Sequence, residues 1–230
     1  MTTRQLCRWH TFATATVLER AAVRRIVEAA SAAIQQRGAF HLVLAGGTTP
    51  RRVYEALCSV AADWSCWHIY FGDERCLPPG DAERNSRMAA KAWLDHVAIP
   101  VAQVHVMPAE LGAIEAARRY ATTLGSVGEF DLVLLGLGED GHTASLFPDQ
   151  DWGIAANSPD VLAVFDAPKP PPERVSISAH RLGQAREVIF LVSGAGKRDA
   201  VTAWRSGQLI PATSITPALG VEVWLEQQLL

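Results

Sequence analysis

The sequence lacks any uncharged apolar run of about 18 residues, the length at which a helix can span a membrane. Its first ten residues also lack the apolar core, about 7–15 residues long, of a secretory signal peptide. We therefore expect a cytoplasmic protein that does not bind a membrane.

The sequence also has little excess charge and few cysteines. The sequence has 21 Lys and Arg residues and 24 Asp and Glu residues. The net charge of −3 gives no broad basic field that would attract nucleic acid. Cations that bind an anionic ligand must therefore be gathered at one site. The four cysteines form no CxxC pair, which indicates reduced thiols rather than a disulfide framework.

Templates for metal and covalent catalysis are missing as well. The seven histidines form no HxxxH or HExxH pair, no Cys–His cluster has zinc spacing, and no GxSxG motif occurs. We expect no metal and no cofactor. The remaining residue types favour attack by water, assisted by a base, with cations holding a phosphate.

Two glycine-rich segments resemble nucleotide-binding motifs, but each contains residues that argue against such a site. Residues 136–141 fit GxGxxG, but Glu139 and Asp140 would repel a pyrophosphate. The segment before Lys197 resembles a phosphate loop, but Leu191 stands at its first glycine and Arg198 at its final Ser/Thr. Lys197 at a helix start could still meet an anion, although a solvent-facing lysine is the commoner case.

Short apolar runs alternate with helical patterns along the chain, which predicts an α/β fold. The predicted strands are Phe40–Ala45, His68–Gly72, Asp131–Leu137, Val161–Asp166 and Glu187–Ser193. The predicted helices are Thr14–Arg37, Pro50–Ala62, Arg84–His96, Glu110–Leu124 and Lys197–Ser206, with Gly38 as a stop signal for the first. We expect a doubly wound, mainly parallel sheet with helices on both faces. One domain should cover residues 1–230, with or without a small subsidiary lobe.

Ligands of open parallel sheets bind at the carboxyl ends of the strands, so the residues that follow each strand are the first candidates. Gly46 and Gly47 let the backbone approach a ligand, Thr48 offers a hydroxyl, and Pro50 suits a first helical turn. This segment is a candidate anion cradle. A plain strand–helix turn with a threonine cap is an equally weighted alternative.

Three charged residues follow the second predicted strand directly. Arg75 suits a phosphate, and Asp73 suits a sugar hydroxyl or a proton. An exposed, ion-paired loop is the competing interpretation.

The segment from Gly138 to Pro148 follows the third predicted strand and is the richest in reactive groups. A histidine beside glycines and carboxylates at a strand end can titrate near neutral pH and act as a general base. We therefore select His142 as the candidate base, although a lone histidine is more often structural.

Taken together, four segments resemble the 6-phosphogluconolactonase family. They are Gly46–Pro50, Phe71–Arg75, Gly136–Pro148 and Gly194–Lys197, and the proline-rich segment Pro168–Ser178 is similar as well. The resemblance extends over about residues 40–200, and its third motif is the most specific. It implies a Rossmann-like fold and hydrolysis of 6-phospho-D-glucono-1,5-lactone to 6-phospho-D-gluconate without a metal.

The resemblance also implies roles for individual residues. His142 would be the general base that activates water, oriented by Asp140. Arg75, Arg174 and Lys197 would hold the phosphate, helped by Gly46, Gly47 and Thr48 at a helix start, and Asp73 would contact the sugar or pair with Arg75. The partner is then a phosphosugar lactone, and we expect a monomer or a weak dimer.

The sequence differs from the family pattern at one position, and two other functions are alternatives to lactone hydrolysis. The family more often has Ser before Asn where this chain has Arg84 before Asn85. Arg84 could add a phosphate contact, but we expect it to face solvent. A glucosamine-6-phosphate deaminase would share the fold, but residues 143–148 lack the downstream Glu of that pattern. A non-catalytic sugar-phosphate sensor would normally carry a helix-turn-helix, whereas the first 40 residues predict one long helix.

Overall fold

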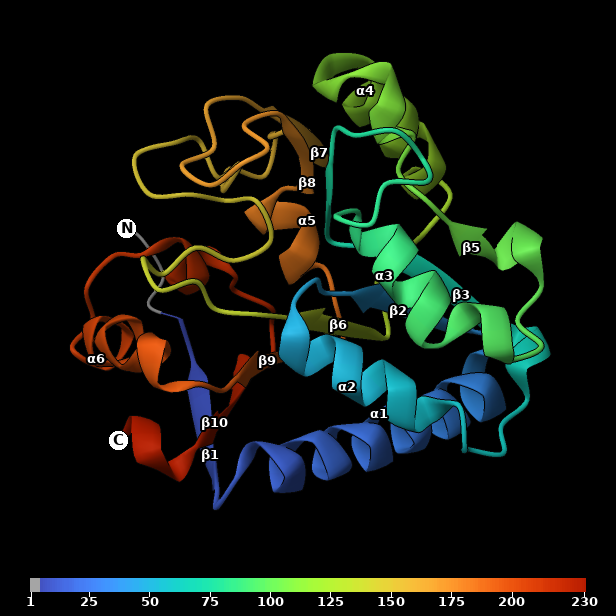
Figure 1. Ribbon diagram of the computed structural model, residues 1–230, viewed down its shortest axis with the longest axis horizontal. Helices are drawn as coiled ribbons and strands as arrows, with labels where there is room; N and C mark the ends of the chain where they lie inside the picture. The colour runs from blue at the N-terminus through green and yellow to red at the C-terminus, as the bar shows by residue number, and fades with distance from the viewer. Residues whose placement is uncertain (1–4) are drawn as a thin grey trace.

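The computed structural model describes residues 5–230, which form a large parallel sheet and a small antiparallel one (Figure 1). The large sheet has the strand order β1-β10-β9-β6-β2-β3-β5, with neighbouring strands parallel throughout. Its strands are β1 (Cys7–Phe12), β2 (Phe40–Leu44), β3 (Trp67–Phe71), β5 (Val104–His105), β6 (Leu132–Leu135), β9 (Val188–Val192) and β10 (Val221–Glu226). The predicted α/β class and mainly parallel sheet are confirmed.

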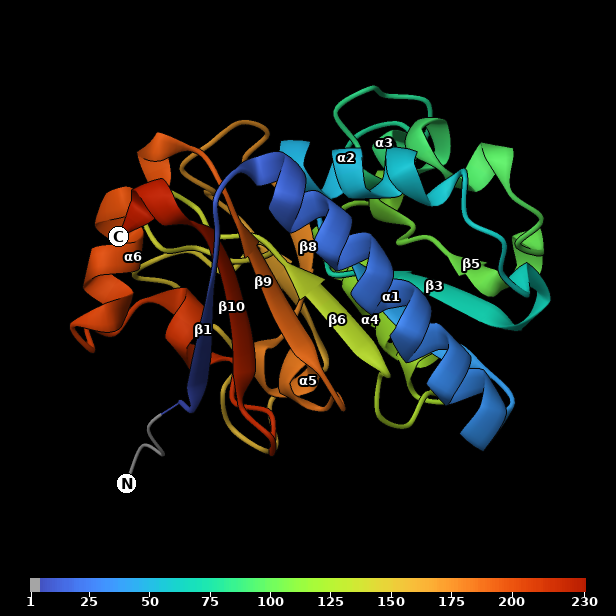
Figure 2. The same ribbon diagram turned by 90° about the horizontal axis from the view of Figure 1, so that it is seen from below.

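Helices cover both faces of this sheet because its central strands are apolar on both sides. One face packs against α1 (Ala15–Arg37), α2 (Thr48–Leu57) and α3 (Asn85–Ala92). The other packs against α4 (Ala113–Leu124), α5 (Ala179–Gly183) and α6 (Arg198–Arg205). In β6, Leu132 and Leu134 face the first group of helices, and Val133 and Leu135 face the second. Figure 2 shows α1 running across the strands of the sheet.

The ends of α1 agree with the sequence signals. Thr14 caps its first turn by accepting a hydrogen bond from the backbone N–H of Val17 at 3.3 Å. Gly38 ends the helix in the left-handed conformation, with φ of 82°, which costs glycine little. Within residues 5–230, no helix is long and apolar enough to cross a membrane.

The small sheet has the order β4-β8-β7 and is antiparallel. Its strands are β4 (Asp73–Arg75), β8 (Arg174–Ile177) and β7 (Val161–Val164). The strand predicted at Val161–Asp166 therefore exists, but it lies outside the parallel sheet. Because β4 follows β3 after a single residue, it brings the end of β3 beside β8, where Arg75 and Arg174 are register partners.

Several predicted helices are shorter than expected. Helix α2 starts at Thr48 and ends at Leu57, and its cap is Gly47 rather than a threonine. The segment predicted as Arg84–His96 splits into α3 and a 3-10 turn, and α4 begins only after Gly112, whose φ is 82°. Strands β1 and β10 were not predicted at all.

Candidate active site

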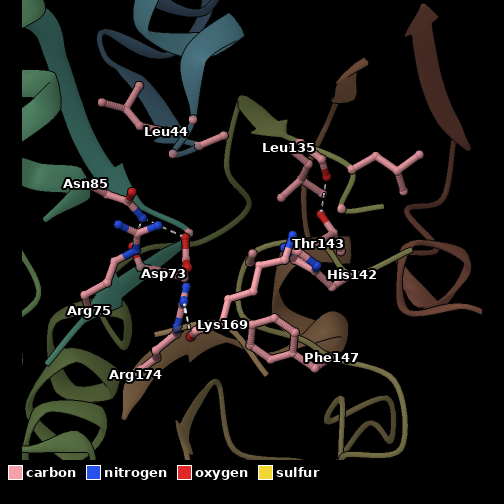
Figure 3. Close-up of a pocket in the computed structure, with 18 of the residues that line it drawn as sticks. Leu44, Asp73, Arg75, Asn85, Leu135, His142, Thr143, Phe147, Lys169 and Arg174 are labelled. Carbon is pink, nitrogen blue, oxygen red and sulfur yellow. Dashed lines mark hydrogen bonds between the residues drawn. The ribbon is translucent and has the colours of Figure 1, made fainter. Parts of the chain in front are cut away.

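A cavity of about 340 Å³ opens at the carboxyl ends of β2, β3 and β6. Figure 3 shows its side chains converging from several segments far apart in the sequence. Its lining includes seven of the predicted site residues: Gly46, Gly47, Asp73, Arg75, His142, Arg174 and Lys197. Gly46, Gly47, His142 and Lys197 follow strands of the parallel sheet, as the rule for such sheets predicts. The other three residues lie in the small antiparallel sheet.

His142 is held by the turn that follows β6. Asp140 Oδ1 lies 2.5 Å from His142 Nδ1 and also accepts the backbone N–H of His142 at 3.2 Å. The backbone N–H of Gly138 donates to the carbonyl of His142 at 2.7 Å. With Nδ1 turned to a carboxylate, Nε2 is the ring nitrogen left for a ligand.

Only a glycine fits at position 138. A Cβ there would stand 2.0 Å from His142 Nδ1 and 2.5 Å from Asp140 Oδ1. The missing side chain therefore lets the carboxylate and the ring meet against the backbone.

The surroundings favour the neutral form of His142 and the ionised form of Asp140. Burial lowers the pKa of His142 below its ordinary value, against the opposing effect of Asp140. Burial is the largest single effect on Asp140 and raises its pKa, but the hydrogen bonds and the charge interaction with His142 together outweigh it, so the pKa is lowered overall. A neutral imidazole oriented by a carboxylate is the arrangement of a general base.

Asp73 is a buried residue of the cavity lining, and each of its two carboxylate oxygens accepts a hydrogen bond. Asn85 Nδ2 donates to Oδ1 at 2.9 Å, and Ser145 Oγ donates to Oδ2 at 2.6 Å. The sequence offered a pairing of Asp73 with Arg75, but Arg75 donates to the carbonyl of Glu83 instead. Asn85 and Ser145 were missed because neither belongs to a recognisable catalytic pattern.

The prediction that Arg84 faces solvent is wrong. Its side chain is 1% exposed and lies 3.4 Å from a carboxylate oxygen of Glu74, which is itself completely buried. Arg84 also donates to Glu110 at 2.9 Å and to the carbonyl of Met107 at 2.7 Å. A buried carboxylate requires a partner, and the arginine supplies it.

Glu74 fixes two residues of the cavity wall through their backbone. Its Oε1 accepts the N–H of Arg75 at 2.9 Å and that of Asn85 at 2.7 Å. Its Oε2 accepts the N–H of Ser86 at 2.8 Å, so a buried carboxylate caps the first turn of α3.

The cations of the site lie on separate segments. Arg75 follows β3, Arg174 begins β8, and Lys197 ends the 3-10 turn after β9. Burial lowers the pKa of Lys197, and Glu139 opposes that effect. Lys169, which the sequence analysis assigned no role, also lines the cavity.

Two predicted residues lie beside the cavity rather than in its lining. Asp140 reaches it through His142. Thr48 is exposed and lines an adjoining hollow of about 240 Å³ that shares Gly47, Arg75 and Asn85 with the main cavity.

Among residues 5–230, no group of three or more His, Cys, Asp or Glu side chains could hold a metal ion.

Comparison with known proteins gives a consistent result. Residues 13–224 match the sequence family described as glucosamine-6-phosphate isomerases/6-phosphogluconolactonase. A 6-phosphogluconolactonase of Mycobacterium tuberculosis is 40% identical over 201 residues, which make up 81% of each chain. One from Synechocystis is 38% identical over 209 residues, 85% of each chain. The structure of 6-phosphogluconolactonase from Trypanosoma brucei matches with a TM-score of 0.86 and 28% identity, over 98% of both chains.

Proposed function

The chain belongs to the glucosamine-6-phosphate isomerase/6-phosphogluconolactonase family, and from that premise we propose that it hydrolyses 6-phospho-D-glucono-1,5-lactone to 6-phospho-D-gluconate. The observation that carries the proposal is the pairing of His142 with Asp140 at the edge of a cavity lined by cations. The reaction belongs to the oxidative part of the pentose phosphate pathway.

His142 acts as the general base. Its Nε2 takes a proton from water while the water oxygen attacks the lactone carbonyl carbon, and Asp140 orients the ring and stabilises the imidazolium. A positioned base contributes about 10²–10⁴-fold to the rate. The lactone is already an activated ester, so positioning supplies much of the rest.

The phosphate is held at the other side of the cavity. Arg75 and Lys197 supply charge, and the start of α2 offers the backbone of Gly46 and Gly47 with the hydroxyl of Thr48. Asp73, fixed by Asn85 and Ser145, faces the sugar hydroxyls. Arg174 lines the same cavity, but two of its three nitrogens donate to backbone carbonyls.

Two rivals are less well supported. For a glucosamine-6-phosphate deaminase, residues 143–148 lack the downstream Glu that would assist the histidine. For a sugar-phosphate sensor, residues 5–40 contain one strand and one helix rather than a helix-turn-helix. Turnover of the lactone separates the proposal from both.

The deciding experiment generates the lactone in situ with glucose-6-phosphate dehydrogenase and follows its hydrolysis above spontaneous opening. Wild type should accelerate opening, and His142→Ala should lose at least 100-fold while still binding 6-phosphogluconate, since a base contributes about 10²–10⁴-fold. His96→Ala, a surface histidine bonded to the carbonyl of Lys91, is the matched control. Absence of acceleration by wild type would refute the function, and near wild-type rates in His142→Ala would refute the base.

We further propose that residues 1–230 work as one sugar-phosphate hydrolase domain, because both sheets contribute to a single cavity. A cytoplasmic location and a monomeric or weakly dimeric state stay predictions.

A further inference from the structure

Lys169 lines the cavity but has no role in the reaction as described so far. It lies in the proline-rich segment between β7 and β8, and its side chain extends toward the turn that carries His142 (Figure 3). Lys169 Nζ lies 3.9 Å from Glu139 Oε2, one residue before Asp140. Both partners of this ion pair are more than half exposed, so the pair is weak and leaves the ammonium free to turn to a ligand.

The backbone at Lys169 is fixed by Arg174. Arg174 NH2 donates to the carbonyls of Lys169 at 2.9 Å and Pro170 at 3.2 Å, and its Nε donates to Pro171 at 3.1 Å. The guanidinium lies 5.5 Å from the centre of the Phe147 ring, and the residue is only 5% exposed. Arg174 therefore connects the lysine segment to the same turn that holds His142.

Three charged groups act on His142 from the surrounding elements. Asp140 belongs to its own turn, Asp73 comes from β4, and Lys169 comes from the proline-rich segment. Both carboxylates raise the pKa of His142 and the lysine lowers it. Lys169 is thus a cation whose charge acts on the base across the cavity.

We propose that Lys169 is a catalytic residue whose ammonium stabilises the carbonyl oxygen as it becomes negative, and that Arg174 is the positioning residue that keeps it there. This inference rests on the proposed lactonase function. It gives Arg174 a role other than the phosphate contact that the sequence suggested.

Hydrolysis proceeds through a tetrahedral intermediate. The water oxygen forms a bond to the lactone carbonyl carbon, one water proton moves to His142 Nε2, and the carbonyl π pair moves to its oxygen beside Lys169. When the tetrahedral intermediate collapses, that pair returns, the bond from carbon to the ring oxygen breaks, and the His142 proton passes to the ring oxygen. The resulting carboxylic acid ionises and releases a proton to solvent. Lys169 keeps its own proton throughout.

The first test compares Lys169→Met with Lys169→Arg, and uses Lys91→Met on the exposed part of α3 as the matched control. Loss of one preorganised donor to an oxyanion costs about 10²–10³-fold in kcat. We expect Lys169→Met to lose about 100-fold in kcat with KM within about threefold, and Lys169→Arg to recover most of the loss. Equal kcat in Lys169→Met and Lys91→Met would overturn the inference while leaving the function intact.

The second test separates positioning from phosphate binding at Arg174. Arg174→Lys keeps a cation but loses the rigid planar fork whose two nitrogens donate to three carbonyls, so kcat should fall about tenfold or more with KM nearly unchanged. In a Lys169→Met background the same change should cost little further, since the two residues act as a unit. A rise in KM with kcat preserved, or fully additive losses, would refute the positioning role.

The third test needs no turnover. Titration of His142 by NMR should show a higher pKa in Lys169→Met than in wild type and Lys91→Met, because a nearby positive charge has been removed. The acid limb of kcat/KM should move to higher pH in the same variant. An unchanged pKa of His142 would overturn the placement of Lys169, whatever substrate the enzyme uses.

Discussion

Replacing Arg84 by methionine should destabilise the whole protein, although the residue touches no ligand in the proposed reaction. The change leaves the carboxylate of Glu74 buried without its cation and removes the donor to the Met107 carbonyl. Breaking a buried ion pair from one side costs about 3–5 kcal/mol. Glu74 keeps three backbone N–H donors, so the loss should fall at the lower end, about 3 kcal/mol.

Denaturation by urea and by heat measures this loss. For a chain of this size, each kcal/mol shifts the melting temperature by about 2–4 °C, so Arg84→Met should melt about 6–12 °C lower. Arg87→Met is the matched control, because the Arg87 side chain is 41% exposed and lies 4.0 Å from Asp95. It should stay within about 0.5 kcal/mol of wild type.

A second variant tests the cause. Adding Glu74→Gln to Arg84→Met removes the uncompensated charge and should recover part of the stability. If Arg84→Met unfolds like the Arg87 control, the Glu74–Arg84 pair does not stabilise the fold and the burial argument is refuted.

Three further predictions concern the reacting groups. Asp140→Asn should reduce kcat by about 10³-fold or more through loss of ring orientation. Because Asp140 raises the pKa of His142, the remaining activity should have its acid limb at lower pH, and a limb at higher pH would contradict the assignment. Gly138→Ala should lose more than about tenfold in kcat/KM because the new Cβ meets His142. Gly128→Ala, at an exposed position where a Cβ has no neighbour within 4 Å, should keep wild-type kinetics, and equal kinetics of the two variants would refute the steric argument. Activity should be unchanged after dialysis against excess EDTA, and a loss that added metal restores would refute the metal-free mechanism.

The parts of the fold that could be predicted are those whose local pattern is strong. Strand β6 is four buried apolar residues, and α1 carries a threonine cap and a terminal glycine, so both follow from sequence alone. Strand β1 alternates between partly buried and exposed residues at the sheet edge and has no apolar run. Strand β4 consists of three charged residues and exists because β8 pairs with it.

Some residues of the site could also be predicted from the sequence, and others could not. His142, Asp140 and the glycines could be predicted because a compact motif at a strand end carries them. Arg84 could not, because Glu74 and Glu110 approach it from distant parts of the chain and only the fold brings them together. The proline-rich segment that contains Lys169 is easy to see in the sequence. The position of its backbone depends on hydrogen bonds from Arg174, which only the fold brings there.

The pairing of β1 with β10 has a consequence for synthesis on the ribosome. Strands β1 and β10 lie side by side (Figure 2), yet residues 7–12 are made about 200 residues before residues 221–226. About 200 residues at roughly 5–20 residues per second leave β1 without its neighbour for about 10–40 s. In the last part of that time, once residues 188–192 have been made, the emerging sheet has an open edge along β9. We expect chaperones and incorrect partners to compete with the native strand at this edge.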